Sequence, residues 1–174
     1  MPPRYVLKQR LVVVGPTLAG VVRFAGGWLF DRVMAGWDAT VLTADHADVR
    51  PLRILGASAF DLDFALAVPD RAPLPEIVAI EASLCDADPR VGLLMRQALD
   101  NGVSDVRFWG ESCSGGLDLV DFSGGTGAVP HRLSFAARAF KAQALTAAAV
   151  PFESIDGVEM FRTGQPARVG DVAR

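Results

Sequence analysis

The chain has 174 residues, of which 51% are hydrophobic and 21% are charged. A chain this apolar can bury a large core, which excludes a disordered protein, and its glycines and prolines follow no collagen-like period, which excludes a fibre. The net charge is −3, and residues 61–125 carry twelve Asp and Glu against four Arg and Lys. We therefore expect no dense basic face for nucleic acid.

The apolar stretch near the N-terminus resembles a membrane span or a signal peptide, but its details argue against both. Leu11–Phe30 contains one charged residue, Arg23, and Gly15-Pro16 interrupts the stretch near its start. An arginine near the centre of a bilayer would cost roughly 2.5–3.5 kcal/mol. The two cysteines, Cys85 and Cys113, match neither a disulfide framework nor a zinc site. We therefore predict a soluble, cytoplasmic protein with reduced thiols.

The first 45 residues have the pattern of a strand, a helix and a second strand. Leu11–Val14 is a short β-branched run typical of a buried strand, and Thr17 can cap the helix that follows. Gly36 is suited to end this helix, and Thr40–Thr43 reads as the second strand. The helix has an apolar stripe at Leu18, Val21, Val22, Ala25, Leu29 and Val33. We predict a right-handed βαβ unit with parallel strands.

The middle of the chain gives weaker signals. Phe60–Val68 alternates and predicts a third strand, whereas Pro75–Leu84 has apolar residues at helical spacing. Asp88-Pro89 is typical of a helix start, and Asn101-Gly102 of its end. Val103–Trp109 alternates as a further strand.

The C-terminal part is expected to hold a long loop, a helix and a hairpin. Glu111–Val129 is rich in Gly and Ser, and Pro130 is expected to open a helix. Phe152–Ile155 and Val158–Arg162 flank Asp156-Gly157, which is a strong signal for a β-hairpin turn.

These elements predict an α/β fold. We expect one three-layer, Rossmann-like domain over residues 1–163, with a short, mostly parallel sheet and a C-terminal β-hairpin. Residues 164–174 read as a tail.

The ends of the first two strands form the first candidate site. In open α/β sheets, ligands bind at the carboxyl ends of the strands, and helix N-termini attract anions. Thr17 follows the first strand, and Asp45, His46 and Arg50 follow the second. Asp45 can accept from a ribose hydroxyl and His46 can act as an acid or base. The spacing Gly15–Gly20 matches neither the dinucleotide fingerprint nor the P-loop, so a plain strand-to-helix turn is the alternative.

The loop after the last predicted parallel strand is the second candidate. Gly110-Glu111-Ser112-Cys113-Ser114 resembles the nucleophile elbow of esterases, Gly-x-Ser-x-Gly, except that Ser114 stands where the last Gly is required. Ser112 or Cys113 would be the nucleophile, with His131 as its base. We count Glu111 among the ligand-binding candidates.

The predicted C-terminal helix and an aromatic set complete the candidates. His131 and Arg132 lie at the start of this helix and can meet a phosphate or an acidic partner. Four aromatic residues in and after the first helix cannot share one face, which predicts either a second packing surface or a homo-oligomer interface. They are Phe24, Trp28, Phe30 and Trp37.

The predicted function is that of a non-catalytic cytosolic binding or regulatory protein, because the chain shows no recognisable catalytic set. One alternative is an enzyme or sensor for a nucleotide or another phosphorylated small molecule at the ends of the first two strands. A second alternative is a Ser or Cys hydrolase that uses residues 110–116. We identify no cofactor and no metal site. The expected partners are a small phosphorylated ligand, a protein or a second copy of the chain, and neither nucleic acid nor a membrane.

Overall fold

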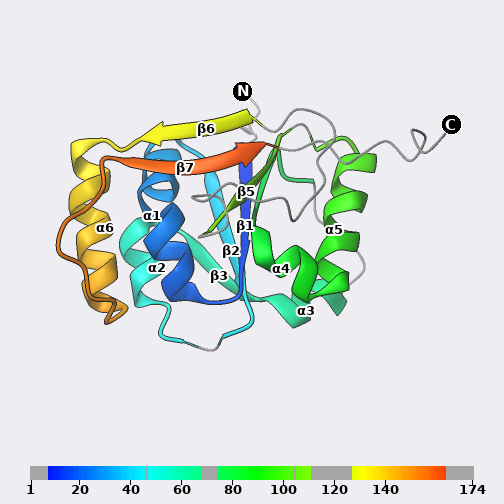
Figure 1. The fold of residues 1–174 in the computed structure, drawn as a ribbon, viewed down its shortest axis with the longest axis horizontal. Helices are drawn as coiled ribbons and strands as arrows, with labels where there is room; N and C mark the ends of the chain where they lie inside the picture. Colours follow the sequence, from blue (N-terminus) through cyan, green and yellow to red (C-terminus); the bar gives the residue numbers. More distant parts are fainter. Residues whose placement is uncertain (1–7, 46, 68–73, 104, 111–126, 164–174) are drawn as a thin grey trace, which may run out of the picture.

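The computed structural model describes residues 8–45, 47–67, 74–103, 105–110 and 127–163. Within these ranges, the strands form one seven-stranded sheet in the order β3-β2-β1-β4-β5-β7-β6 (Figure 1). The strands are β1 (Arg10–Gly15), β2 (Asp38–Thr43), β3 (Ser58–Asp61), β4 (Ile77–Glu81), β5 (Asp105–Trp109), β6 (Gly127–Arg132) and β7 (Val158–Thr163). The helices are α1 (Leu18–Met34), α2 (Arg50–Leu55), α3 (Leu62–Ala67), α4 (Ala82–Ala87), α5 (Pro89–Asp100) and α6 (Phe135–Ala147).

The chain is an α/β protein with a mostly parallel sheet, as its sequence predicts. Strands β1 to β5 are parallel to their neighbours, and β7 is antiparallel to both β5 and β6. Helices α1, α2 and α6 cover one face, and α3, α4 and α5 cover the other (Figure 1). Alternate residues of β1 therefore serve two cores: Leu11 and Val13 face α1, whereas Val14 faces the α4–α5 side.

The predicted strand–helix–strand unit with parallel strands is confirmed. β1 and β2 pair in parallel, with Val13 opposite Val41. The Thr17 side chain caps α1 by accepting from the Gly20 amide at 3.1 Å. After α1 ends, Gly36 takes a φ of +92°, a left-handed conformation that glycine adopts without strain.

Two predictions for the middle of the chain are wrong. Ile77–Glu81 is a central strand and not part of a helix. The prediction failed because a strand buried on both faces is an unbroken apolar run without alternation, and because Ile77, Ile80 and Leu84 share helical spacing. The third strand was predicted over Phe60–Val68, but β3 ends at Asp61 and the helix α3 follows it directly. The Asp61 carboxylate accepts from the Phe64 amide at 2.7 Å and so caps the start of α3.

The predicted C-terminal hairpin is also wrong. Residues 152–155 form no strand, and β7 pairs instead with β6, which precedes α6. Pro130 lies inside β6 and does not open the helix. Ser134 caps α6 by accepting from the Ala137 amide. Proline has no amide N–H to donate to a neighbouring strand. Pro130 is tolerated because β6 lies at the edge of the sheet, where one side of the strand has no neighbour to pair with.

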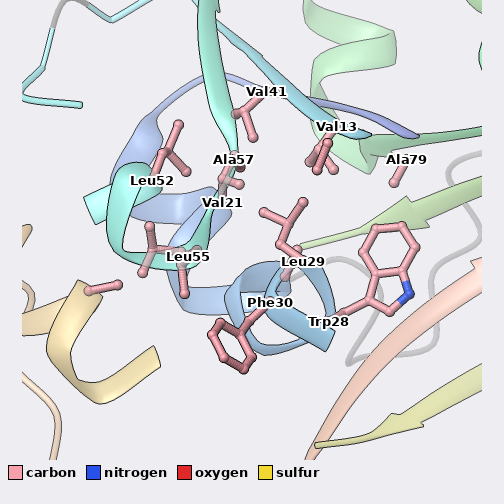
Figure 2. Close-up of a cluster of buried hydrophobic side chains, with 14 of the residues drawn as sticks. Val13, Val21, Trp28, Leu29, Phe30, Val41, Leu52, Leu55, Ala57 and Ala79 are labelled. Atoms are coloured by element: carbon pink, nitrogen blue, oxygen red, sulfur yellow. The ribbon is translucent and has the colours of Figure 1, made fainter. Parts of the chain in front are cut away.

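Helix α1 is enclosed by other parts of the same chain. Figure 2 shows Leu52 and Leu55 of α2, and Val13 and Val41 of the sheet, gathered around Val21 and Leu29 of α1. The aromatic residues of α1 find intrachain partners: the Trp28 ring lies 4.7 Å from that of Phe161, and Phe30 stacks on Phe140 at 4.5 Å. The second packing surface of the aromatic set is therefore supplied by β7 and α6. Among the described residues, no helix combines the length and apolarity needed to cross a bilayer.

A buried ion pair joins α1, α6 and β7. Lys141 of α6 donates to Glu159 of β7 at 2.6 Å, and both side chains are almost fully buried. The Glu159 carboxylate also accepts from the Gly27 and Trp28 amides of α1, at 2.9 and 2.7 Å. Burial raises the pKa of Glu159, while Lys141 and the two amides act in the opposite direction.

Candidate functional site

The strand order places a topological switch point between β1 and β4. From β1 the chain proceeds to β2 and β3 on one side, and then returns to β4 and β5 on the other. The strand order reverses at this point, and the connections leave the carboxyl ends of β1 and β4 in opposite directions. Ligands of open α/β sheets bind at such switch points. The residues that follow β1 and β4 are therefore the structural candidates for a site.

Glu81 ends β4 at this point and is half-buried. Its Oε2 accepts from the Ser83 hydroxyl at 2.5 Å and from the Leu84 amide at 3.0 Å, which caps α4. Its Oε1 lies beside Gly110 at the end of β5, where a Cβ would be only 2.5 Å away. Gly110 also has a φ of +118°, so its lack of a side chain serves both the turn and the approach of Glu81. The carboxylate is therefore held between β4 and β5.

The end of β1 packs closely on an aromatic side chain. A Cβ on Gly15 would lie 2.7 Å from Cζ2 of Trp109 and 2.9 Å from Val21, so only glycine fits here. Trp109 is 1% exposed, and its ring centroid lies 6.2 Å from that of Phe24. Trp109 Nε1 is buried without a hydrogen-bond partner among the described residues. The floor beneath the end of β1 is therefore largely aromatic and carries no charge.

Thr17 and Asp45, both predicted from the sequence, come together at the start of α1. Both carboxylate oxygens of Asp45 lie within hydrogen-bond distance of the Leu18 amide, at 3.1 and 3.0 Å. Thr17 satisfies the Gly20 amide. The first turn of α1 therefore already holds a carboxylate at the place where an anionic ligand would otherwise meet free amides.

The other predicted residues do not join this pair. His46 and Glu111 lie outside the described residues, as do Ser112 and Cys113. Arg50 is exposed and lies 3.6 Å from Asp48.

His131 and Arg132 belong to β6, at the opposite end of α1 from Thr17. His131 contacts Asp31, fourteen residues beyond Thr17 along the helix, which is a separation of about 20 Å at 1.5 Å per residue.

Asp31 links the end of α1 to the β6–α6 connection. It accepts from the Ser134 hydroxyl at 2.6 Å, and its other oxygen lies 2.8 Å from Nε2 of His131. Burial alone would raise the pKa of Asp31, but the hydrogen bonds from Ser134 and His131 outweigh it and hold the pKa below its ordinary value. Ser134 donates to Asp31 and not to His131, so the three residues have the geometry of a structural clasp and not that of a nucleophile and its base.

Sequence reasoning missed Glu81 because the strand before it was predicted as a helix. The usable signal was the four-residue apolar run Ile77–Ile80, followed at once by a carboxylate and Ser83. A buried parallel strand that ends in polar residues is the pattern of a ligand-binding edge.

The described residues do not offer a metal site. No group of three or more His, Cys, Asp and Glu side chains among them is placed to hold an ion.

Solved structures with a similar fold include enzymes. A triple mutant of a deacetylase of the teicoplanin biosynthetic pathway is 14% identical, covers 92% of this chain and 100% of its own, and superposes with a TM-score of 0.67. The zinc-inhibited form of the teicoplanin deacetylase Orf2 is 17% identical over 79% of this chain and 83% of its own, with a TM-score of 0.56. GalB, a 4-carboxy-2-hydroxymuconate hydratase from Pseudomonas putida, is 14% identical over 95% of this chain and 100% of its own, with a TM-score of 0.52.

The comparisons by sequence give a different result. No protein-family model matches the chain, and no curated protein matches it in sequence. The likeness to the solved structures is therefore one of fold.

These comparisons contradict the predicted non-catalytic binding or regulatory role. Proteins that share this architecture over nearly the whole chain include a deacetylase and a hydratase. The sequence-based prediction relied on the lack of a recognisable catalytic pattern. That inference fails because catalytic groups at a sheet edge come from separate strand ends and need no fixed spacing in the chain.

Proposed function

We propose that this protein is an enzyme that brings water to the reacting carbon of a small polar substrate at the switch point between β1 and β4. The observation that carries this proposal is the Glu81 carboxylate, held half-buried at the carboxyl end of β4. The fold shared with a deacetylase and a hydratase supports it, since both activities are reactions with water.

Glu81 is suited to general acid–base catalysis. Its Oε2 is fixed by Ser83 and Leu84, whereas its Oε1 has no described hydrogen-bond donor and lies toward Gly110. In hydrolysis of an acylated amine, Oε1 would take a proton from water as the water oxygen bonds to the carbonyl carbon. The same proton would then pass to the nitrogen as the carbon–nitrogen bond breaks. The products are a carboxylic acid and a free amine, and Glu81 regains its charge.

The surroundings favour an uncharged substrate. Asp45 occupies the first turn of α1 and would repel a phosphate brought to the same amides. Gly15 and the buried Trp109 present no charge beneath the end of β1. Acylated amines and esters meet these conditions better than phosphorylated compounds do. We place this reaction in the cytoplasm, because two cysteines without a disulfide framework are typical of reduced thiols.

The test is acyl release from a panel of N-acetylated amino sugars, N-acetylated amines and O-acetyl esters, followed as acetate produced. For a substrate that is turned over, Glu81→Gln should lower kcat by about 100-fold or more, because the amide cannot accept the proton of water. Glutamine keeps an oxygen for the Ser83 and Leu84 bonds, so the fold should survive, which a thermal melt checks.

Asp61→Asn is the matched control. Asp61 ends β3 and caps α3 as Glu81 ends β4 and caps α4. It lies three strands from β4, which is about 14 Å at the usual strand spacing. This variant should keep the activity. Lack of acyl release across the panel, or full turnover by folded Glu81→Gln, would overturn the proposal.

A further inference from the structure

We propose a second binding site at the corner between β6 and α6, which takes a small organic anion: a phosphate or carboxylate joined to an apolar or aromatic body. The corner holds an open groove of about 360 Å³, in the size range of small-molecule sites. Its lining residues are Arg132, Leu133, Phe135, Arg138, Gly157 and Val158. Arg132 follows His131, which contacts Asp31 near the C-terminal end of α1, and Leu133 packs against Gly27 of the same helix.

Two guanidinium groups and no carboxylate line the groove. In the part of the chain that the structure describes, neither Arg132 nor Arg138 forms an ion pair, whereas Arg90 and Arg107 each pair with an aspartate at 2.7 Å. Two guanidiniums that line one concave surface without a counter-charge attract anions, and their planar forks match the oxygens of phosphates and carboxylates.

The Arg138 guanidinium lies close to the backbone of Gly157. A Cβ on Gly157 would overlap Nη2 of Arg138, so the guanidinium lies directly against the main chain there. The Leu133 amide donates to the Gly157 carbonyl at 2.9 Å, which ties that main chain to the segment after β6. Glycine at position 157 therefore leaves the space in which the guanidinium sits.

The apolar part of the ligand follows from the remaining lining residues. Phe135 is 89% exposed and Val158 is 39% exposed, and both line the same groove as the two arginines. An exposed phenyl ring beside paired cations suits a ligand with one charged end and one apolar end. The volume accommodates a small molecule and not a folded domain.

The experiment is a titration of the full chain with inorganic phosphate, phenyl phosphate and benzoate, followed by isothermal calorimetry and by amide chemical shifts. We expect saturable binding of at least one aryl anion, tighter than that of inorganic phosphate because of Phe135, and weaker as ionic strength rises. The order of phenyl phosphate and benzoate then identifies the anionic group. Arg138→Ala should weaken binding by about tenfold or more.

Gly157→Ala separates a built site from general charge attraction. It leaves the net charge and both arginines in place but displaces the Arg138 guanidinium, so binding should weaken, though by less than in Arg138→Ala. Arg96→Ala, at an exposed position of α5, removes the same charge elsewhere and should leave binding unchanged. No saturable binding, an equal loss in Arg96→Ala, or full binding in Gly157→Ala would overturn the proposal.

Discussion

Helix α1 receives a carboxylate at two places, and the two contacts have different consequences. Asp45, which follows β2, binds the first amide of α1 and is half-buried. Glu159 of β7 binds two amides in the interior of the helix, is 2% exposed at its side chain and pairs with Lys141. Water can replace Asp45, because the start of a helix is accessible to solvent, but no water replaces Glu159. The same chemical contact is thus a local cap in one region and a requirement of the fold in the other.

Removal of the buried cation should destabilise the protein more than any change at the start of α1. Lys141→Ala leaves Glu159 buried without its counter-charge, and we expect a loss of about 3–5 kcal/mol in the free energy of unfolding. Urea denaturation measures it. The double variant Lys141→Met/Glu159→Gln removes both charges together and should lose less than Lys141→Ala alone. A loss below about 1 kcal/mol for Lys141→Ala would show that the buried pair does not hold β7 and α6 to α1.

The close approach at Gly27 gives the next largest effect. A Cβ on Gly27 would overlap Leu133, which follows β6, so Gly27→Ala should destabilise the protein by about 1–3 kcal/mol. The adjacent Gly26→Ala is the matched control, because its nearest atom, Cδ1 of Leu55, is 3.4 Å away and alanine favours the helix. Thermal melts of the two variants should therefore move in opposite directions. Equal melting temperatures would contradict the packing of β6 against α1.

The cap at the start of α1 should matter less. Asp45→Ala removes the partner of the Leu18 amide, and we expect a loss of about 1 kcal/mol, the usual cost of a missing N-cap acceptor. Asp45→Asn should lose less, since its amide oxygen still accepts. Urea denaturation of both variants beside Lys141→Ala tests the comparison directly. If Asp45→Ala lowers the free energy of unfolding as much as Lys141→Ala does, the Asp45 and Glu159 contacts of α1 are equally important to the fold, which would contradict the comparison.

The clasp at Asp31 predicts a small pH dependence. Because the pKa of Asp31 in the folded protein is below its ordinary value of 3.8, its contribution to stability is complete above that value and is lost as pH falls through the lowered pKa. The stability difference between the native protein and Asp31→Asn should therefore shrink as pH falls below about 5. Urea denaturation at about pH 7 and about pH 3 measures this, and a difference that grows toward the lower pH would contradict the sign.

Much of the fold could be predicted from local pattern. The β1–α1–β2 unit, the Thr17 cap and the helix that starts at Pro89 depend on residues close together in sequence, and all three are confirmed. The strand at Ile77–Glu81 could not be recognised, because burial on both faces removes the alternation that identifies a strand. Because this strand was missed, the position of Glu81 at the end of β4 was missed as well. In contrast, Thr17 and Asp45 both lie at the first turn of α1, as their positions after neighbouring strands predicted.

The sequence alone determined the α/β class and the opening parallel pair, because hydrophobic period and helix caps act over a few residues. Only the tertiary structure decided that β7 pairs with β6 across α6, since contacts between residues far apart in the chain have no local pattern. The same holds for the burial of Lys141. At its helix position a lysine reads as a solvated residue, and it becomes a buried one only because Glu159, 18 residues further along the chain, lies beside it.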